Sequence, residues 1–105
     1  MSTARLTSSV ALIVKMTAKP GMEGELSDFL VGALELADNE PGTLTWFALQ
    51  TDPSTFWIVD SFASEEQRQA HLDGPIAAAL MGNAERLLAV PPEISSATVL
   101  AAKIP

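Results

Sequence analysis

The sequence predicts an α+β domain of the ferredoxin-like, split βαβ arrangement, with the element order β-α-β-β-α-β. Stretches with apolar residues at helical spacing alternate with four short runs rich in β-branched and aromatic residues. Proline, glycine and aspartate mark most boundaries between these elements. The 105 residues, 48% of them hydrophobic, are enough for one domain with one core.

The first half of the chain predicts a strand, a helix and a second strand. The β-branched and apolar run over residues 10–17 indicates a strand, and Lys19-Pro20-Gly21 interrupts it. Apolar residues then recur at helical spacing between Met22 and Ala37, until the turn residues Asn39-Glu40-Pro41-Gly42 stop the helix. Residues 43–50 indicate the second strand.

A hairpin and a capped helix follow. Residues 51–54 predict the hairpin loop, and residues 55–62 the returning strand. In the run Ser64-Glu65-Glu66-Gln67 the Ser64 hydroxyl can accept from the backbone of Gln67, whose side chain reaches back; this is a capping box.

The last third of the chain predicts a broken helix and a final strand. The helix begun at the capping box should run to about Leu72, where Asp73-Gly74-Pro75 interrupts it. A second helical segment should end near Leu88. Pro91-Pro92 forces an extended connection, and residues 94–103 indicate the last strand.

The predicted strands are apolar on both faces. In the second strand Leu44 and Trp46 lie on one face, while Phe47 and Leu49 lie on the other. Two helices cover only one face of such a sheet, so we expect a homodimer that packs sheet against sheet, forming a dimeric α/β barrel. The alternative is that the second face is an apolar surface open to water.

Composition excludes several classes of function. Thirteen acidic against six basic residues give a net charge of −7, which disfavours nucleic-acid and membrane-surface partners. The absence of cysteine excludes disulfides and thiolate chemistry, and one histidine leaves little room for a metal centre. We expect residues 1–9 to be a disordered or loosely ordered tail, and residues 10–105 to be a single cytoplasmic domain.

A series of short motifs runs through nearly the whole chain in a distinctive order. It comprises Lys19-Pro20-Gly21-Met22-Glu23, Glu40-Pro41-Gly42-Thr43, Phe56-Trp57-Ile58-Val59-Asp60-Ser61-Phe62, Ser64-Glu65-Glu66, and Ala70-His71-Leu72 before Gly74-Pro75. Over about residues 10–103 the sequence resembles the antibiotic biosynthesis monooxygenase (ABM) superfamily of dimeric α+β barrels.

The resemblance implies a homodimer with a pocket between sheet and helices in each subunit. Members oxidise quinol or polyphenolic substrates with molecular oxygen, without flavin, haem or metal, so the resemblance implies no cofactor. In that chemistry the protein removes a proton, stabilises an enolate-like anion and excludes water.

The sequence also departs from the family. Phe62 stands where relatives often have tryptophan, and Asp60 where the strand usually has glutamate. Enzymatic members use a strand asparagine to hold the substrate oxygen, but Asn39 and Asn83, the two asparagines here, fall in a turn and in the last helix. Haem-degrading relatives also use a strand asparagine, so its absence counts against haem degradation as well. The alternative to an enzyme is therefore a non-catalytic small-ligand-binding or stress-response protein.

Two ionisable residues are the candidate catalytic groups. His71 is the candidate proton carrier, because its unperturbed pKa lies near neutrality; the alternative is a structural histidine at the helix break. Asp60 would orient His71 or contact the substrate. Because a buried aspartate in a strand is costly when unpaired, it should either pair with a cation such as Lys15 or Arg68 or line a polar pocket.

The remaining candidates would contact an aromatic substrate. Trp46, Trp57 and Phe62 could form an aromatic wall, of which at most some can face one pocket, and core or interface packing is the alternative for each. Gln67 lies four residues before His71 on the same helical face. The leading hypothesis is a cofactor-independent monooxygenase acting on a small quinol or polyphenol. A third possibility is an aldoxime- or haem-handling relative, which would need to ligate iron through the histidine.

Overall fold

The computed structural model of the chain describes residues 9–104. The predicted tail at residues 1–9 lies almost wholly outside this range. Four strands and three helices follow one another along the chain: β1 (Val10–Thr17), α1 (Glu23–Asp38), β2 (Thr43–Asp52), β3 (Thr55–Phe62), α2 (Glu65–Leu72), α3 (Pro75–Leu87) and β4 (Glu93–Thr98).

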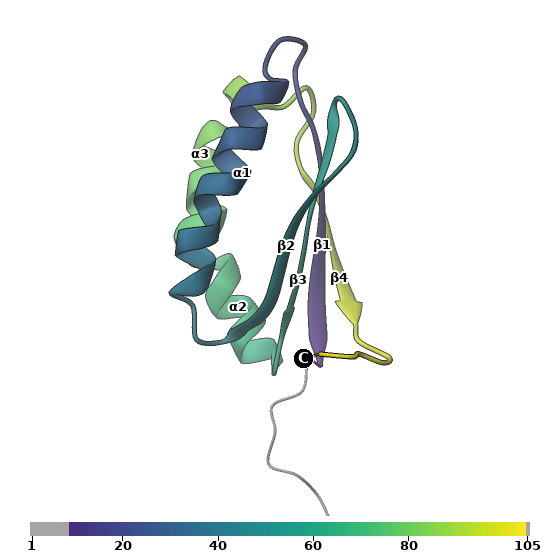
Figure 1. Cartoon of the computed structure of the whole chain (residues 1–105). Coiled ribbons are helices and arrows are strands. Elements are labelled where there is room, and N and C mark those ends of the chain that lie inside the picture. The colour runs from purple at the N-terminus through teal and green to yellow at the C-terminus, as the bar shows by residue number, and fades with distance from the viewer. Residues whose placement is uncertain (1–8, 105) are drawn as a thin grey trace, which may run out of the picture.

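The strands form one antiparallel sheet in the order β2-β3-β1-β4. β3 lies between β1 and β2, so the first βαβ unit is split, as the sequence predicts. All three helices cover the same face of the sheet (Figure 1). The α+β, ferredoxin-like fold class is confirmed, whereas the dimeric barrel stays a prediction.

The core lies between the helices and the sheet face that they cover. Along β1 the side chains alternate, and Leu12, Val14 and Met16 are buried toward the helices. Leu26 and Leu30 of α1 meet this face from above, because a four-residue spacing places both on one stripe of the helix. This apolar core between the helices and the sheet fixes the positions of the helices over the sheet.

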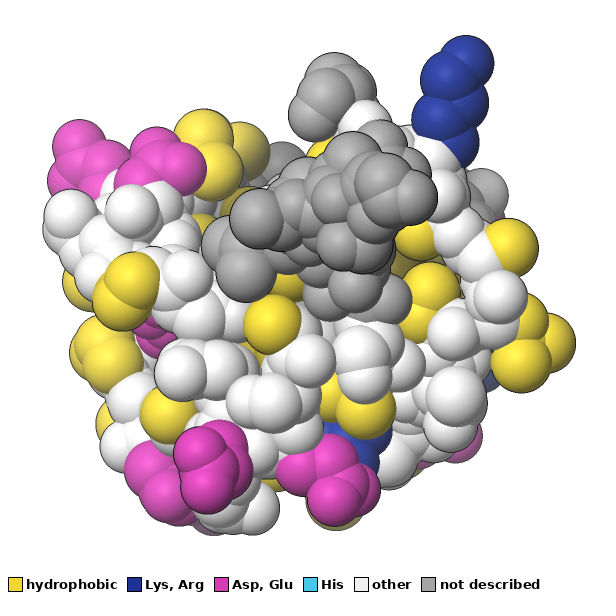
Figure 2. Space-filling view, turned by 90° about the horizontal axis from the view of Figure 1, so that it is seen from below, with side chains coloured by type: hydrophobic (Ala, Val, Ile, Leu, Met, Phe, Trp, Pro, Cys, Tyr) yellow, Lys and Arg dark blue, Asp and Glu magenta, His cyan; other side chains and the backbone are white. Residues whose placement is uncertain are grey.

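The sheet face away from the helices carries large apolar side chains. Phe47 and Leu49 of β2 are 56% and 46% exposed. Three further residues on this face are half-buried and pair across the strands with these two or with one another: Ile13, Trp57 and Val59. We call these five residues the rear face. In Figure 2, hydrophobic side chains reach the surface along the right-hand side of the view, where the sheet lies.

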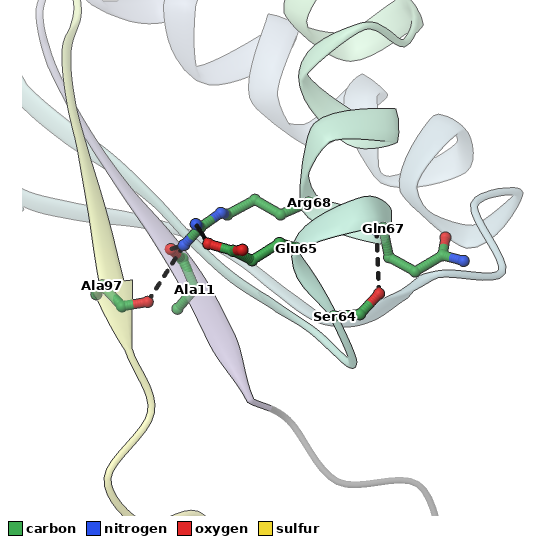
Figure 3. A network of polar contacts seen from close by, with 6 residues as sticks. All are labelled: Ala11, Ser64, Glu65, Gln67, Arg68 and Ala97. Atoms are coloured by element: carbon green, nitrogen blue, oxygen red, sulfur yellow. Dashed lines mark hydrogen bonds and ion pairs between the residues drawn. The ribbon is translucent and has the colours of Figure 1, made fainter.

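Three details of the sequence prediction are wrong. β2 extends to Asp52 and not to residue 50, so the hairpin loop is shorter than predicted. The last strand ends at Thr98 and not at residue 103, because Thr98 pairs with Val10, the first residue of β1, and the ladder ends there. The capping box is only half formed. The Ser64 hydroxyl accepts from the backbone N–H of Gln67 at 3.3 Å, but the Gln67 side chain points away from Ser64 (Figure 3).

The pairing of β2 with β3 shifts register between Thr43 and Thr45. Thr43 and Trp46 are paired with Phe62 and Asp60, which are both buried on the helix-covered side. An irregularity of this kind re-aims side chains, so two residues three positions apart in β2 share one face. Plain alternation, as assumed from the sequence, would place them on opposite faces.

No helix in residues 9–104 combines the length and the apolar character needed to cross a membrane.

Candidate functional site

Two carboxylates hold one imidazole between them at the end of the sheet near α2. Nδ1 of His71 lies 2.6 Å from Oε1 of Glu40, and Nε2 lies 3.0 Å from Oδ2 of Asp60. Asp60 is 1% exposed and His71 is 8% exposed. We call Glu40, Asp60 and His71 the carboxylate–histidine cluster. It joins three segments that are far apart in the sequence.

Each member of the cluster is positioned by a different element. Asp60 points inward from β3 between Ile58 and Phe62, which are both buried. His71 lies in the last turn of α2, and Glu40 follows the end of α1 in the connection to β2. The geometry of the cluster therefore depends on how the sheet, α2 and the α1–β2 connection pack together.

Arg68 anchors α2 on the sheet. Its guanidinium donates to the backbone oxygens of Ala11 in β1 and Ala97 in β4, each at 3.4 Å, and it pairs with Glu65 at 3.2 Å (Figure 3). His71 follows Arg68 by three residues and so lies on nearly the same side of the helix. These contacts hold the imidazole over the sheet, above Asp60.

The α1–β2 connection fixes Glu40 from its own sequence. The Thr43 hydroxyl donates to Oε1 of Glu40 at 2.8 Å, and the backbone N–H of Thr43 donates to the Glu40 carbonyl at 3.2 Å. Oε1 of Glu40 thus lies against two donors, the Thr43 hydroxyl and the His71 ring. A carboxylate held in this way keeps its orientation when a ligand approaches.

The arrangement favours the protonated form of His71. Burial lowers the pKa of His71, but hydrogen bonds to Asp60 and Glu40, together with the charges of these carboxylates, raise it by more. The pKa of His71 therefore stands above its ordinary value of 6.5. Because both ring nitrogens face carboxylate oxygens, an imidazolium can donate to each of them, whereas a neutral ring could donate to only one.

A hollow of about 260 Å³ opens next to the cluster. Glu40, Gln67 and His71 contribute polar side chains to its wall, and residues of the α1–β2 connection and of the α2–α3 junction complete it. A Cβ at Gly74 would come within 3.3 Å of Oε2 of Glu40, so a side chain there would crowd the second oxygen of this carboxylate. One wall of the hollow is therefore the carboxylate of Glu40, which the neighbouring imidazolium of His71 holds in place.

The structure brings some of the sequence-predicted residues together. Asp60 and His71 form an ion pair, and the ring centroids of Phe62 and His71 are 5.2 Å apart. Trp46 is half-buried on the same side of the sheet and is the cross-strand partner of Asp60. Gln67 is exposed and lines the hollow. These are placements; the catalytic and substrate-binding roles of these residues stay predictions.

The structure decides between the alternatives that the sequence left open for Trp57 and Asp60. Trp57 lies on the rear face, where its indole N–H donates to Thr51 at 2.9 Å and the Lys15 ammonium lies 5.8 Å from its ring centroid. Successive side chains along a strand point to opposite faces of the sheet. Trp57 lies on the rear face and Trp46 on the helix-covered face, so the two cannot share an aromatic wall. The partner of Asp60 is His71, not Lys15 or Arg68, since these two cations are engaged elsewhere.

Sequence reasoning did not single out Glu40. In the run Asn39-Glu40-Pro41-Gly42 it reads as part of a helix stop, and that is also where it lies in the fold. Its contact with His71 spans 31 residues, which no local pattern reveals. The available signal was Thr43, since a hydroxyl three residues after a carboxylate can hydrogen-bond back to it.

A second hollow, of about 440 Å³, lies near the C-terminal end of α3. Its wall is mostly apolar and includes Met81, Leu88 and Val90; Lys19 lies there with its ammonium donating to the carbonyl oxygen of Glu85 at 2.5 Å. It is larger than the first hollow, and Lys19 and Glu85 line it, but it lies away from the buried carboxylate–histidine cluster. The smaller hollow is the better candidate for chemistry.

Among residues 9–104 no group of histidine, aspartate and glutamate side chains has an arrangement suited to a metal ion.

Comparison with known proteins places the chain in a family. The family model described as antibiotic biosynthesis monooxygenase matches residues 9–82, which is most of the chain. The chain belongs to the antibiotic biosynthesis monooxygenase family. No curated protein matches the sequence of this family member.

Solved structures similar to this ABM-family chain agree with the assignment. The NE2512 protein of Nitrosomonas europaea, described as a protein of unknown function, is 54% identical with a TM-score of 0.93, covering 96% of this chain and 98% of its own. A Chloroflexus aurantiacus protein that carries the ABM family name is 29% identical with a TM-score of 0.71, covering 91% and 97%. The PA3566 protein of Pseudomonas aeruginosa is 21% identical with a TM-score of 0.79, covering 93% and 100%, which shows a shared fold.

Proposed function

We propose that this protein is a cofactor-independent monooxygenase that oxidises a small quinol or phenol with molecular oxygen. The observation that carries the proposal is the position of Glu40. Its carboxylate lies on the wall of the 260 Å³ hollow while His71, itself held by Asp60, fixes one of its oxygens. This is a preorganised proton acceptor beside a space for a ligand. Family membership supports the reaction class.

In this proposal Glu40 takes the proton of a substrate hydroxyl. His71 is the positioning residue, because an imidazolium with both N–H groups engaged has no lone pair with which to accept a proton. The deprotonated substrate is electron-rich and reduces O₂. A hydroquinone and one O₂ would give a hydroxyquinone and one water; the substrate supplies all the electrons, so no separate reductant is needed.

The size of the hollow favours a substrate with one ring. Pockets for drug-sized ligands measure roughly 300–1,000 Å³. The hollow beside Glu40, at about 260 Å³, falls just below that range. We therefore propose single-ring hydroquinones and phenols as the substrate class, in preference to polycyclic ones.

Oxygen consumption tests the proposal. The purified protein is mixed with a panel of hydroquinones and phenols while an oxygen electrode and mass spectrometry follow O₂ and products. We expect Glu40→Gln to lower kcat at least about 100-fold, since general bases contribute roughly 10²–10⁴-fold. Glu35→Gln, an exposed glutamate in α1, is the matched control and should leave kcat unchanged. Equal turnover by wild type and Glu40→Gln would contradict the proposal.

We also propose that two copies pack through their rear faces to form the homodimer. Phe47 and Leu49 supply large exposed apolar side chains to this face, and a contiguous apolar patch is uncommon on a monomer. Sedimentation equilibrium at micromolar concentration tests it: a dimer mass is expected, and a monomer mass would contradict it.

The second candidate function is binding of a small ligand without chemistry. One observation favours it: both ring nitrogens of His71 are engaged by carboxylates, as in a structural histidine. Saturable binding of a hydroquinone with no O₂ uptake would select this alternative. The same two contacts disfavour iron ligation by His71, and a haem titration without a shift of the Soret band would remove the haem-handling alternative.

A further inference from the structure

The half-buried Trp46 and the buried Asp60 face each other across β2 and β3, next to the carboxylate–histidine cluster. Trp46 and Asp60 are direct cross-strand partners. Trp46 packs against both hydrophobic clusters of the helix-covered side, and Asp60 reaches His71 on α2, so both side chains point toward the helices. Directly opposed residues of an antiparallel pair have Cβ atoms roughly 5 Å apart.

Each of these side chains contributes a polar atom without a partner. Nε1 of Trp46 and Oδ1 of Asp60 are buried, and within residues 9–104 neither makes a hydrogen bond. A buried polar atom left unsatisfied costs about 1–3 kcal/mol. Two such atoms on neighbouring, directly paired residues indicate a shared partner, since native proteins rarely leave them unpaired.

The chemistry of the two atoms defines that partner. An indole N–H can only donate a hydrogen bond, and an aspartate carboxylate can only accept one. A hydroxyl group can accept from Trp46 and donate to Asp60 through the same oxygen atom. We infer that Trp46 and Asp60 form a buried binding site for one hydroxyl group, supplied by water or by a phenolic substrate.

This site discriminates among ligand classes. An ammonium group cannot accept from the indole N–H, and a carboxylate cannot donate to Asp60 and is repelled by its charge. An ether oxygen can accept from Trp46 but leaves Oδ1 of Asp60 unsatisfied. Phenol should therefore bind more tightly than anisole, its methyl ether, although both carry the same ring.

If the hydroxyl belongs to a phenolic substrate, this site extends the proposed function, and only in that case does the inference rest on that function. The other oxygen of Asp60 lies 3.0 Å from Nε2 of His71, whose Nδ1 contacts Glu40. A hydroxyl held by Asp60 thus joins a continuous series of polar contacts that ends at the hollow. In that case Trp46 would hold a second substrate hydroxyl, distinct from the one that gives its proton to Glu40, and would act as a specificity-determining residue.

The indole N–H proton of Trp46 reports directly on this site. The chain has two tryptophans, so a ¹⁵N-labelled sample gives two indole signals, and Trp57→Phe identifies that of Trp46. In the wild-type protein without ligand, we expect a magnetisation-transfer cross-peak between the Trp46 indole proton and a long-lived internal water. This outcome supports water as the source of the hydroxyl.

Titration with phenol and with anisole distinguishes the other source. If phenol enters the site, it shifts the Trp46 indole signal to saturation and removes the water cross-peak, while anisole does neither. Trp46→Phe should then weaken phenol binding about tenfold, the equivalent of one hydrogen bond. Trp57→Phe, on the rear face, is the matched control and should bind phenol as the wild type does.

Two outcomes would overturn the inference: an indole signal with neither a water cross-peak nor a phenol response, or an equal response to phenol and anisole. Neither comparison requires a variant that might fail to fold. Failure of the proposed function is distinguishable, because a phenol response at Trp46 without O₂ uptake would retain this site and remove the monooxygenase.

Discussion

The two faces of the sheet depart in opposite ways from the usual separation of apolar interior and polar surface. The helix-covered face holds Asp60, which is 1% exposed, and the rear face presents Phe47, which is 56% exposed. A buried carboxylate and an exposed aromatic ring are both unfavourable unless a partner compensates for them. Each face therefore indicates an interaction that the strands alone do not provide.

The two faces of the sheet differ in where the compensating partner comes from. Asp60 is compensated within the chain, because His71 reaches it from α2 and Glu40 supports His71 from the α1–β2 connection. The rear face has no covering element between residues 9 and 104, since all three helices lie on the other side. Our interpretation is that chemistry is built into one face and assembly into the other, and four changes would break or sharpen this comparison.

The largest effect is expected from His71→Ala. It leaves Asp60 buried without its ion pair, and breaking a buried pair typically costs about 3–5 kcal/mol. Urea unfolding should show that loss of unfolding free energy. Adding Asp60→Asn should recover part of it, because the second change removes the unpaired charge. Gln69→Ala, an exposed change in the same helix, should stay within about 0.5 kcal/mol of wild type. A loss for His71→Ala no larger than that of the control would mean that the cluster is not holding the fold together.

Phe47→Asp tests the other face. If two rear faces pack together, each copy would bury an unpaired carboxylate, which should weaken the dimer at least about 100-fold, or roughly 2.7 kcal/mol. Val31→Asp in α1 is the matched control, because Val31 is 71% exposed on the helical side. Analytical ultracentrifugation of the two variants gives the comparison; an unchanged dimer in Phe47→Asp would place the contact elsewhere.

The stability of the protein should fall as pH rises. The folded-state pKa of His71 is raised above 6.5 by Asp60 and Glu40 despite its burial, so its stabilising contribution is complete below pH 6.5 and is lost as pH rises through the raised pKa. The chain has no cysteine or tyrosine, so few other groups titrate in that range. Urea unfolding between pH 6 and 9 measures the fall, which should be smaller in Glu40→Gln. A rise in stability over the same range would reverse the assigned sign.

The smallest effect concerns the wall of the hollow. A Cβ at Gly42 would overlap the Gln67 side chain, so Gly42→Ala should cost about 1 kcal/mol as that side chain moves away. Gly82→Ala, in the interior of α3 with open space around it, should instead stabilise by about 0.5–1 kcal/mol through helix propensity. Calorimetry of both variants checks the opposite signs.

Local patterns predicted most of the fold. The strands at Val10–Thr17 and Thr55–Phe62 match the prediction residue for residue, because β-branched and aromatic runs bounded by turn residues leave little ambiguity. Ser64 caps α2 as expected. The end of β4 was wrong because it depends on where its neighbour β1 begins, which is a property of the assembled sheet.

The site was less predictable than the fold. His71 and Asp60 could be selected by residue type, but their pairing depends on the packing of α2 over β3. Glu40 was hidden in a turn motif. The sequence could not decide which of Trp46, Trp57 and Phe62 face the helices, because residue type alone does not say which side of a strand they cover. The register shift in β2, which brings Thr43 and Trp46 to one side, has no sequence signature that periodicity could detect.

The carboxylate–histidine cluster joins the α1–β2 connection, β3 and α2. A related protein without any catalytic activity would still unfold more readily if it lost these side chains. Selection for folding alone would then preserve the apparent active site. Retention of the same three residues in another protein is therefore no proof that it catalyses anything, and activity has to be established by turnover.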